Sequence, residues 1–573
     1  MSTINFGAKP ATSPTHGGGV RGADLSRRSS QFEGRFGRMF RSLPPAEWPE
    51  EALLELGKEM VAKPEEDPAD ATKPGAAPED PKKVFQDDEE NSGIPAGYTY
   101  LGQFIDHDIT FDPASSLQKQ NDVDGLVDFR TPRLDLDSLY GRGPDDQPYL
   151  YVGKKFRLGR KLFERNKPSK SRDLPRFDDP ENPGMPKRAL IGDKRNDENV
   201  IVSQLHGAML QFHNKLVDKM PKASFAEVQR QVRWHYQWIV VNDFLVKLCG
   251  ADVVHEILPH LGKYKPIWEN KPKLQFYQVR NEAFMPIEFA AAAYRFGHSM
   301  VRPIYRLNTE LKGGDKKDEA TKAEEESGVA GRFFIFAGVQ ERGLNGFDSF
   351  PKEWAIDWRL YFDTHGSTAL PGKHRVQPSY KIDTSLVNPL GFLPEFSKVV
   401  PASPPLTIEK LQAKPDGKGH GPANLAQRNL LRGMAMALPS GQDVARAMGL
   451  VPIADENLRI CKAVIEDWDD PATPKLSTFH GGAFIGKAPL WFYVLAEAMH
   501  EWVLRAKAPG SKGDEEPLHL GAVGQRIVAE TLIGLLLADG HSYLRQAPNW
   551  QPEDAGYVGP NFTMGALIKF ALA

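Results

Sequence analysis

Apolar residues recur with the spacing of an α-helix over long stretches of this sequence. In 199–220, for example, Leu205, Met209 and Phe212 fall on one stripe. The same pattern occurs in 225–250, 286–301, 424–438, 488–506 and 522–540. Strand signals are few and short, such as "RFFIFAG" at 332–338. With 573 residues available for a large core, we expect a mainly α fold of several long helices, with long connecting loops and few short strands.

Composition changes along the chain predict its division into parts. Residues 1–30 are rich in Gly, Ser and Thr, and a short helical pattern at 47–62 precedes a segment rich in Pro and charge. We therefore expect a flexible N-terminal extension and linker over 1–93 and one large domain over 94–573. Within that domain, the charged stretch 309–331 and the stretch 414–424 are predicted to be loops.

The overall charge and the apolar runs exclude several classes of protein. A formal net charge of −3 and a pI near 6.6 give no electrostatic basis for binding nucleic acid. No run approaches the roughly 20 apolar residues of a membrane-spanning helix, and the N-terminus lacks the apolar core of a secretory signal. Two cysteines are too few for a disulfide framework. We expect a soluble protein, cytoplasmic or exported without a recognisable signal peptide, and its oligomeric state is open.

The segment "GQFIDHD" places ionisable groups inside an apolar run. On a helix, Gln103, Asp106 and His107 share one face, and Asp108 lies about 100° further round. Unpaired burial of such groups costs several kcal/mol each. The segment is therefore either a helix end with solvated aspartates around a core histidine or part of a functional site.

Alternating oxygen donors follow in "RTPRLDLDSLYG". In an extended loop, Thr131, Arg133, Asp135 and Asp137 turn to one side. Together with Asp108 they offer a hydroxyl, a backbone carbonyl and three carboxylates, the ligand set that Ca²⁺ prefers. Alternating aspartates also occur in ordinary turns, so the spacing alone leaves both interpretations open.

Two later segments carry further candidates. In "IGDKRNDENV", Asp193 can cap the following helix, and Arg195 and Glu198 then project from one side of its first turn. A surface ion pair would have the same spacing. In "AAAYRFGHSMVRP", Arg295 and His298 follow small residues that leave room for something large and flat. A histidine there is also compatible with a satisfied core residue.

These segments in this order resemble the peroxidase–cyclooxygenase superfamily, in particular its animal-type haem peroxidases. The resemblance rests on "GQFIDHD", "GDKRNDE", "YRFGH" and "PANLAQR", extends from about residue 94 to near the C-terminus, and is greatest to bacterial members. It implies the helical core of that family and a peroxidase that reduces hydrogen peroxide, as in a response to oxidative stress. Halides, thiocyanate or aromatic molecules would be the electron donors.

The resemblance also implies a haem b site. His107 and Arg195 match the distal histidine and arginine, which move the peroxide proton and stabilise developing charge, and Gln103 matches the glutamine that orients water. His298 matches the proximal iron ligand, whose second ring nitrogen would bond Asn424.

Further positions match residues that hold the haem and a calcium ion. Arg295 and Arg428 match the partners of the haem propionates. Asp106 and Glu198 match the carboxyl groups that form esters to the haem. Calcium would bind Asp108, Thr131, Arg133 through its carbonyl, Asp135 and Asp137, of which Asp137 departs from the usual serine.

Two alternatives stay open at this point. A fatty-acid dioxygenase of the same superfamily would use a tyrosine three residues before the proximal histidine, but here that position is Arg295 and Tyr294 lies one residue earlier. A one-residue shift turns a helical side chain by about 100°, which disfavours the dioxygenase. The second alternative is a non-catalytic module that binds haem or calcium, and the presence of His107, Arg195 and His298 disfavours it.

Overall fold

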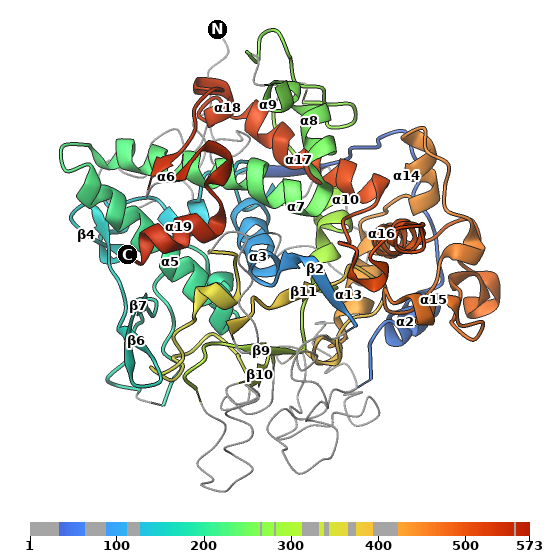
Figure 1. Ribbon diagram of the computed structural model, residues 1–573, viewed down its shortest axis with the longest axis horizontal. Coiled ribbons are helices and arrows are strands. Elements are labelled where there is room, and N and C mark those ends of the chain that lie inside the picture. The colour runs from blue at the N-terminus through green and yellow to red at the C-terminus, as the bar shows by residue number, and fades with distance from the viewer. Residues whose placement is uncertain are drawn as a thin grey trace, which may run out of the picture.

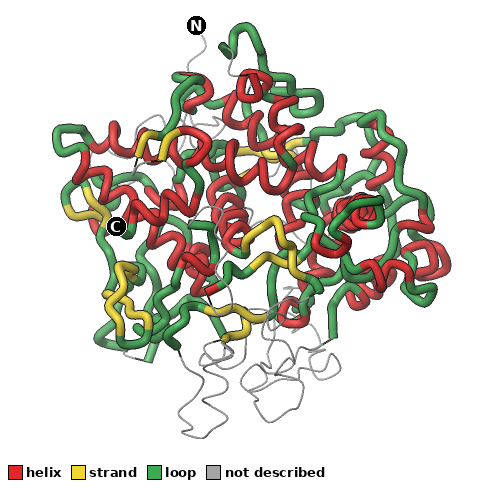
Figure 2. The backbone as a smooth tube through the Cα atoms, in the orientation of Figure 1, coloured by secondary structure: helices red, strands yellow, loops and turns green. Residues whose placement is uncertain are grey.

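The computed structural model shows a largely helical protein with short strands at its periphery (Figures 1 and 2). It describes residues 34–63, 88–111, 127–182, 184–263, 266–279, 282–311, 332–336, 343–364, 374–393, 422–554 and 557–573. The sequence predictions for 1–30, for most of the linker and for most of 309–331 and 414–424 lie outside these residues.

Helix α3, Gly97–Ile109, lies at the centre of the molecule beside α5, Val200–Lys219 (Figure 1). Its apolar side chains, among them Leu101, Phe104 and Ile105, are almost completely buried. The side chain of Asn199 accepts hydrogen bonds from the backbone N–H groups of Ile201 and Val202 at the start of α5. The prediction that Asp193 caps this helix was wrong, because Asp193 caps the separate 3₁₀ turn Lys194–Asp197. The central helix is therefore held in the core and carries "GQFIDHD" there.

The predicted helix over 225–250 is continuous but changes its winding. It consists of α6, Phe225–Ile239, a π-helical turn over Val240–Phe244, and α7, Leu245–Cys249. Ser224 and Glu227 form a capping box at its start. Gly250 ends it with a φ of 84°, a left-handed conformation that favours glycine. The shorter helices α8, Ala251–Ile257, and α9, Pro259–Lys263, follow.

The C-terminal part contributes two long, largely buried helices. Helices α16, Leu490–Ala506, and α17, Ala522–Ala538, pack together and are buried along most of their length. Glu497 of α16 accepts hydrogen bonds from the backbone N–H groups of Val523 and Gly524, which fixes the start of α17. The other helices in this half are α13, Leu425–Ala435, α14, Gly441–Ala447, α15, Ile465–Asp469, α18, Tyr543–Gln546, and α19, Met564–Ala571.

The strands are short and form small sheets. The three-stranded sheet has the order β3, Val127–Asp128, β1, Gly34–Gly37, and β8, Met285–Pro286, with β1 antiparallel to β3 and parallel to β8. The remaining pairs are antiparallel: β2, Glu90–Pro95, with β11, Pro378–Tyr380; β9, Ile304–Arg306, with β10, Arg332–Phe334; β4, Tyr151–Val152, with β5, Lys155–Phe156; β6, Lys161–Glu164, with β7, Lys167–Arg172; and β12, Glu553–Asp554, with β13, Tyr557–Val558. The predicted mainly α class is confirmed.

The N-terminal segment packs into the body, contrary to the boundary expected at residue 94. Strand β1 belongs to the three-stranded sheet, and α2, Glu50–Glu59, packs on α13. At Gly57 an added Cβ would lie 2.7 Å from the backbone nitrogen of Gln427, so the two helices are in close contact there. Residues 34–63 are therefore part of the same core and not a separate extension.

The stretch 286–301 is not one helix, as its periodicity predicted. It divides into α10, Ile287–Ala290, and the 3₁₀ segment Ala293–His298, separated by Ala292 with φ −136° and ψ −78°. Tertiary hydrogen bonds explain the break: the Tyr294 hydroxyl donates to the carbonyl of Gly102 on α3, and Arg295 Nε donates to the carbonyl of Ala290. These contacts outweigh local helix propensity. The remaining four-residue helix, α4, is Asp137–Tyr140.

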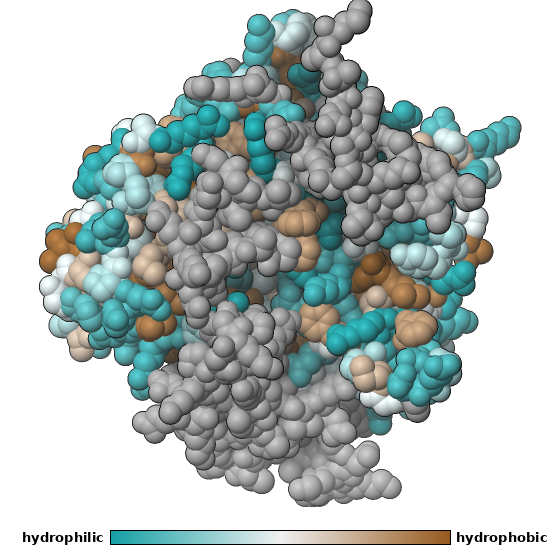
Figure 3. Space-filling view, turned by 180° about the vertical axis from the view of Figure 1, so that it is seen from behind, coloured by the Kyte–Doolittle hydropathy of each residue, from teal (hydrophilic) through white to brown (hydrophobic). Residues whose placement is uncertain are grey.

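Within the part of the chain that the structure describes, no helix is both long and apolar enough to cross a bilayer. On the face shown in Figure 3, the hydrophobic side chains of these residues occur in small groups among hydrophilic ones.

Candidate active site

A cavity of about 260 Å³ lies between α3 and the 3₁₀ segment 293–298. It brings together most of the predicted haem-site residues: Gln103, Asp106, His107, Glu198, Arg295 and His298 all line it. Apolar side chains complete the wall, including Phe244, Phe296, Val301, Ile335, Leu390 and Leu425. A largely apolar cavity with a few polar groups from different elements is typical of a cofactor site.

His107 is a neutral imidazole in this cavity. Burial, reinforced by the charge of Arg195, lowers its pKa to about 3. Its Nδ1 lies 2.8 Å from the side-chain oxygen of Asn196, which only accepts hydrogen bonds. The proton is therefore on Nδ1, and Nε2 is left as a proton acceptor.

Arg195 lies beside His107 but does not line the cavity. Its guanidinium donates to the carboxylate of Asp193 at 2.8 Å and to the backbone carbonyls of His107 and Thr110 at 3.1 and 2.6 Å. It also stacks over the Phe111 ring, 4.7 Å from its centroid. Arg195 therefore acts on His107 through its charge, with its Nε and Nη2 donors engaged by the protein.

The remaining polar groups of the distal wall are held by hydrogen bonds. Thr110 Oγ1 donates to Asp106 Oδ1 at 3.0 Å, and Asn199 Nδ2 donates to Gln103 Oε1 at 3.1 Å. Burial raises the pKa of Asp106, although Arg195 and Arg295 oppose this shift. The Asp106 carboxyl is thus easier to protonate than an exposed aspartate.

The partner of His298 is Asn429, and the predicted bond to Asn424 was wrong. The amide nitrogen of Asn429 lies 2.8 Å from His298 Nδ1, and its amide oxygen accepts from Arg295 Nη1 at 3.1 Å. Asn424 instead caps α13 through the backbone N–H of Gln427 and donates to the carbonyl of Gly57. The predicted Arg428 donates to the carbonyl of Pro422 at 3.2 Å.

Helical periodicity contains the signal that would have found Asn429. On α13 the buried residues Ala426, Asn429 and Leu430 recur at i, i+3 and i+4, so Asn429 is a polar residue on the apolar stripe. Arg432 follows Asn429 by three residues and therefore lies on the same helical face, whereas Arg428 is turned from it by about 100°.

The predicted calcium ligands also come together. Carboxylate oxygens of Asp108, Asp135 and Asp137 lie within 4.8 Å of one another, and the Thr131 hydroxyl donates to Asp135 at 2.9 Å. Burial and the neighbouring Asp135 raise the pKa of Asp108 to about 7. Three crowded carboxyls of this kind require a cation or protons, so the donor set fits a hard divalent ion. The orientation of the Arg133 carbonyl is fixed in part by the bond from Arg133 N to the Thr131 carbonyl at 2.7 Å.

An ion-pair network joins this acidic cluster to the distal side. Arg130 contacts Asp137 at 3.3 Å and also pairs with Asp193, which in turn holds Arg195. Asp193 lies between two guanidinium groups, and although burial opposes its ionisation, Arg195 and Arg130 hold its pKa well below the usual value. The cluster and the distal arginine are thus connected through two side chains.

The residues around the cavity fit a haem group. Burial and the charge of Arg295 lower the pKa of His298 to about 3, so its imidazole is neutral, as an iron ligand must be. His107 and His298 line the same cavity from different elements, and Arg295 beside them provides a cation for a carboxylate. The dry, apolar wall suits the body of a porphyrin.

Comparison with known proteins agrees with this site. The family profile described as animal haem peroxidase matches residues 118–328. The matched segment contains Arg195, Glu198 and His298, whereas α3 lies before it.

The proteins with similar sequence are distant relatives of this chain. Chorion peroxidase of Aedes aegypti is 28% identical over 126 residues, which are 21% of this chain and 15% of that protein. Thyroid peroxidase of Mus musculus is 27% identical over 131 residues, 21% of this chain and 13% of that protein. The chain thus matches only a small part of each of these relatives.

A solved structure shares the fold over nearly the whole length. Peroxidase A from Dictyostelium discoideum superimposes with a TM-score of 0.51 and 14% identity, covering 93% of this chain and 95% of that one. The predicted animal haem peroxidase fold is confirmed by this likeness. The predicted resemblance to bacterial members stays a prediction.

Proposed function

We propose that this protein is a haem peroxidase that reduces hydrogen peroxide and oxidises small donors. The observation that carries the proposal is the pairing of two neutral imidazoles, His107 and His298, on one cavity. His298 would hold the iron through Nε2 once the side-chain amide of Asn429 turns over, so that the amide oxygen accepts from His298 Nδ1, and Arg295 would meet a propionate. When bound, haem b would supply the redox-active iron at which peroxide is reduced.

His107 would move the proton that this reaction requires. Its Nε2 is free to accept a proton from hydrogen peroxide, because Nδ1 already donates to Asn196. The same atom would return the proton to the departing oxygen, which then leaves as water. Arg195 would add positive charge beside His107, and Gln103, held by Asn199, would orient water.

Asp106 and Glu198 would attach the haem covalently as esters. Both side chains line the cavity, and the raised pKa of Asp106 favours the neutral carboxyl from which an ester forms. Mass spectrometry of the denatured, peroxide-treated holoprotein tests this assignment. Haem should stay on the polypeptide in the wild type, and wholly free haem would refute the ester assignment.

Calcium would stabilise the helix that carries the proton-transfer histidine. The carboxylates of Asp108, Asp135 and Asp137, the Thr131 hydroxyl and the Arg133 carbonyl would be the ligands. Asp108 directly follows His107, so the ion would fix the end of α3 and with it the position of the imidazole.

The test is turnover of hydrogen peroxide with iodide and with guaiacol, a small phenol, by haem-loaded protein. His107→Gln should lower the rate by about 10²–10⁴-fold, whereas His541→Gln, the same change at an exposed histidine, should leave it unchanged. Full haem occupancy without turnover would favour the non-catalytic module. Conversion of linoleate by oxygen without peroxide would favour the fatty-acid dioxygenase.

A further inference from the structure

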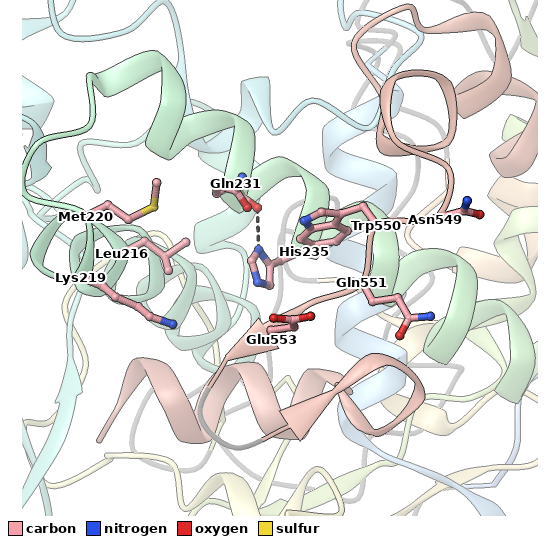
Figure 4. A pocket seen from close by; sticks show the side chains of 9 residues that line it. All are labelled: Leu216, Lys219, Met220, Gln231, His235, Asn549, Trp550, Gln551 and Glu553. Atoms are coloured by element: carbon pink, nitrogen blue, oxygen red, sulfur yellow. Dashed lines mark hydrogen bonds between the residues drawn. The ribbon is translucent and has the colours of Figure 1, made fainter.

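A second pocket, with a volume of about 590 Å³, lies beside α5 and α6 (Figure 4). Its walls come from the end of α5, from α6 and from the segment after α18. The lining residues are Leu216, Lys219, Met220, Gln231, His235, Asn549, Trp550, Gln551 and Glu553. This volume is within the usual range for a site that binds a small molecule.

The apolar part of this pocket suits a planar ring. The His235 and Trp550 rings meet edge to face with centroids 5.0 Å apart, and Leu216 and Met220 lie across from them (Figure 4). His235 is held in place, because its Nδ1 lies 2.7 Å from the carbonyl oxygen of Gln231. Two fixed aromatic walls and flexible aliphatic side chains form a slot that favours an aromatic ligand.

The polar part suits a neutral ligand that both donates and accepts hydrogen bonds. Lys219 contributes one positive charge and Glu553 one negative charge, and both extend toward the same side of the pocket below His235 (Figure 4). The side-chain amides of Gln551 and Asn549 add donors and acceptors. Because the two charges cancel, the pocket does not favour a simple anion such as a halide. A phenol, with an aromatic ring and one hydroxyl group, matches both parts.

Trp550 connects the pocket to a cluster of oxidisable rings. Its ring centroid lies 5.6 Å from that of Trp234, 6.3 Å from Trp238 and 6.1 Å from Tyr543. The ring centroids of Trp238 and Tyr543 lie 6.0 Å apart, and both side chains are buried. Tryptophan and tyrosine are the aromatic side chains that lose an electron most readily, so this cluster offers a route from the surface to the interior.

Helix α6, which carries Trp234 and Trp238 of this cluster, continues through the π-helical turn to the candidate haem cavity. Phe244, at the end of the π-helical turn, lines that cavity, and its ring centroid lies 6.3 Å from that of Tyr294. Trp238 precedes Phe244 by six residues, a rise of about 9 Å along the helix axis. The neighbouring Tyr236 packs on Phe104 of α3 at 6.1 Å, so a second contact joins the same helix to the distal wall.

From this arrangement we propose that the pocket at Trp550 binds a phenol and that the phenol is oxidised there by electron transfer through the tryptophan cluster. This inference rests on the proposed peroxidase function. Each phenol would give up one electron, which would pass through the cluster toward the haem site, and its hydroxyl proton, which Glu553 would pass to solvent. Two phenols thus supply the two electrons, and solvent returns the two protons, with which one hydrogen peroxide becomes two water molecules.

Binding is tested first and without peroxide, by calorimetric titration of the haem-loaded protein with guaiacol. Trp550→Ala removes one wall of the slot and should weaken binding about tenfold. Trp550→Phe keeps an aromatic wall and should bind nearly as the wild type does. Trp268→Phe, at a tryptophan with 65% of its surface exposed, is the matched control and should have no effect. Equal affinity of wild type and Trp550→Ala would overturn the assignment of the pocket.

Turnover then separates this inference from the proposed function. Trp550→Phe should lower peroxide-driven oxidation of guaiacol several-fold at saturating donor, because phenylalanine is much harder to oxidise, while iodide oxidation at the haem cavity stays unchanged. Unchanged guaiacol turnover in Trp550→Phe would overturn electron transfer through Trp550. Absence of iodide turnover in the wild-type protein would instead count against the proposed peroxidase function.

Peptide mapping supplies a readout that needs no donor. When the haem-loaded protein is treated with peroxide alone, oxygen addition should appear at Trp550 and should be suppressed by guaiacol. Oxidation of the exposed Trp268 to the same extent would show diffuse damage and overturn the directed route.

Discussion

Replacing Asn429 with alanine should loosen the proximal side of the site, and the cost follows from two contacts. The Asn429 amide bonds neutral His298 and the charged Arg295. A neutral hydrogen bond contributes about 0.5–1.5 kcal/mol and one to a charged group about 1.5–3 kcal/mol. Because both partners are largely buried, we expect a loss of about 2–4 kcal/mol in unfolding free energy or in haem binding.

Asn424→Ala is the matched control, since it lies on the same helix and carries the same amide. It removes the cap of α13 and the bond to Gly57, which should cost about 1 kcal/mol of stability. It does not touch His298.

The assay combines a haem titration followed by absorbance with resonance Raman spectroscopy of the iron–histidine stretch. Asn429→Ala should weaken haem binding and shift that stretch, because the imidazole loses its hydrogen-bond partner. Asn424→Ala should change neither, apart from a lower unfolding temperature. A shifted stretch in Asn424→Ala together with an unchanged one in Asn429→Ala would refute the reasoning.

Three further predictions concern protonation, metal and packing. Because His107 has a pKa of about 3, its Nε2 stays a proton acceptor at all higher pH values. The rate constant for the reaction with peroxide, measured by stopped flow, should therefore be the same between pH 7 and pH 5. A decrease in this rate constant centred near pH 6.5, the pKa of an exposed histidine, would contradict the prediction. Chelation with EGTA should lower both the unfolding temperature and the peroxide turnover of the wild type. Asp137→Asn should reduce the size of this effect, because it removes a negative charge from the acidic cluster. An unfolding temperature that does not respond to EGTA or calcium would exclude the metal site. Gly57→Ala should cost about 1–3 kcal/mol in thermal or denaturant unfolding, since its Cβ would meet the backbone of Gln427 at 2.7 Å, whereas Lys58→Ala on the exposed face should be neutral.

Local signals predicted much of the helical framework. Periodicity over 199–220 and 225–250 predicted the helices that begin with α5 and α6. The structure shows that their starts are fixed by Asn199, Ser224 and Glu227, whose capping bonds involve residues only two or three positions away. The helical face shared by Gln103, Asp106 and His107 is equally local and is found on the cavity wall. Such features depend on short-range geometry that a sequence encodes directly.

Long-range contacts account for what the sequence could not predict. The break at Ala292 depends on Tyr294 bonding α3, almost two hundred positions away. The choice of Asn429 over Asn424 depends on how α13 turns when α2 packs on it at Gly57. The orientation of Arg195 depends on Asp193, which Arg130 also holds. Each is decided by a partner that no local pattern identifies.

The π-helical turn at Val240–Phe244 has a consequence for evolution and engineering of this helix. A π turn holds one residue more than an α turn, so it determines how the side chains of α6 are rotated about the helix axis relative to those of α7. Deleting one residue there would restore a regular helix and rotate the two halves by about 100° relative to each other. His235 and Phe244 could then no longer face the surface pocket and the inner cavity at the same time. The one extra residue of the π turn thus allows a single continuous helix to line both the surface pocket and the inner cavity.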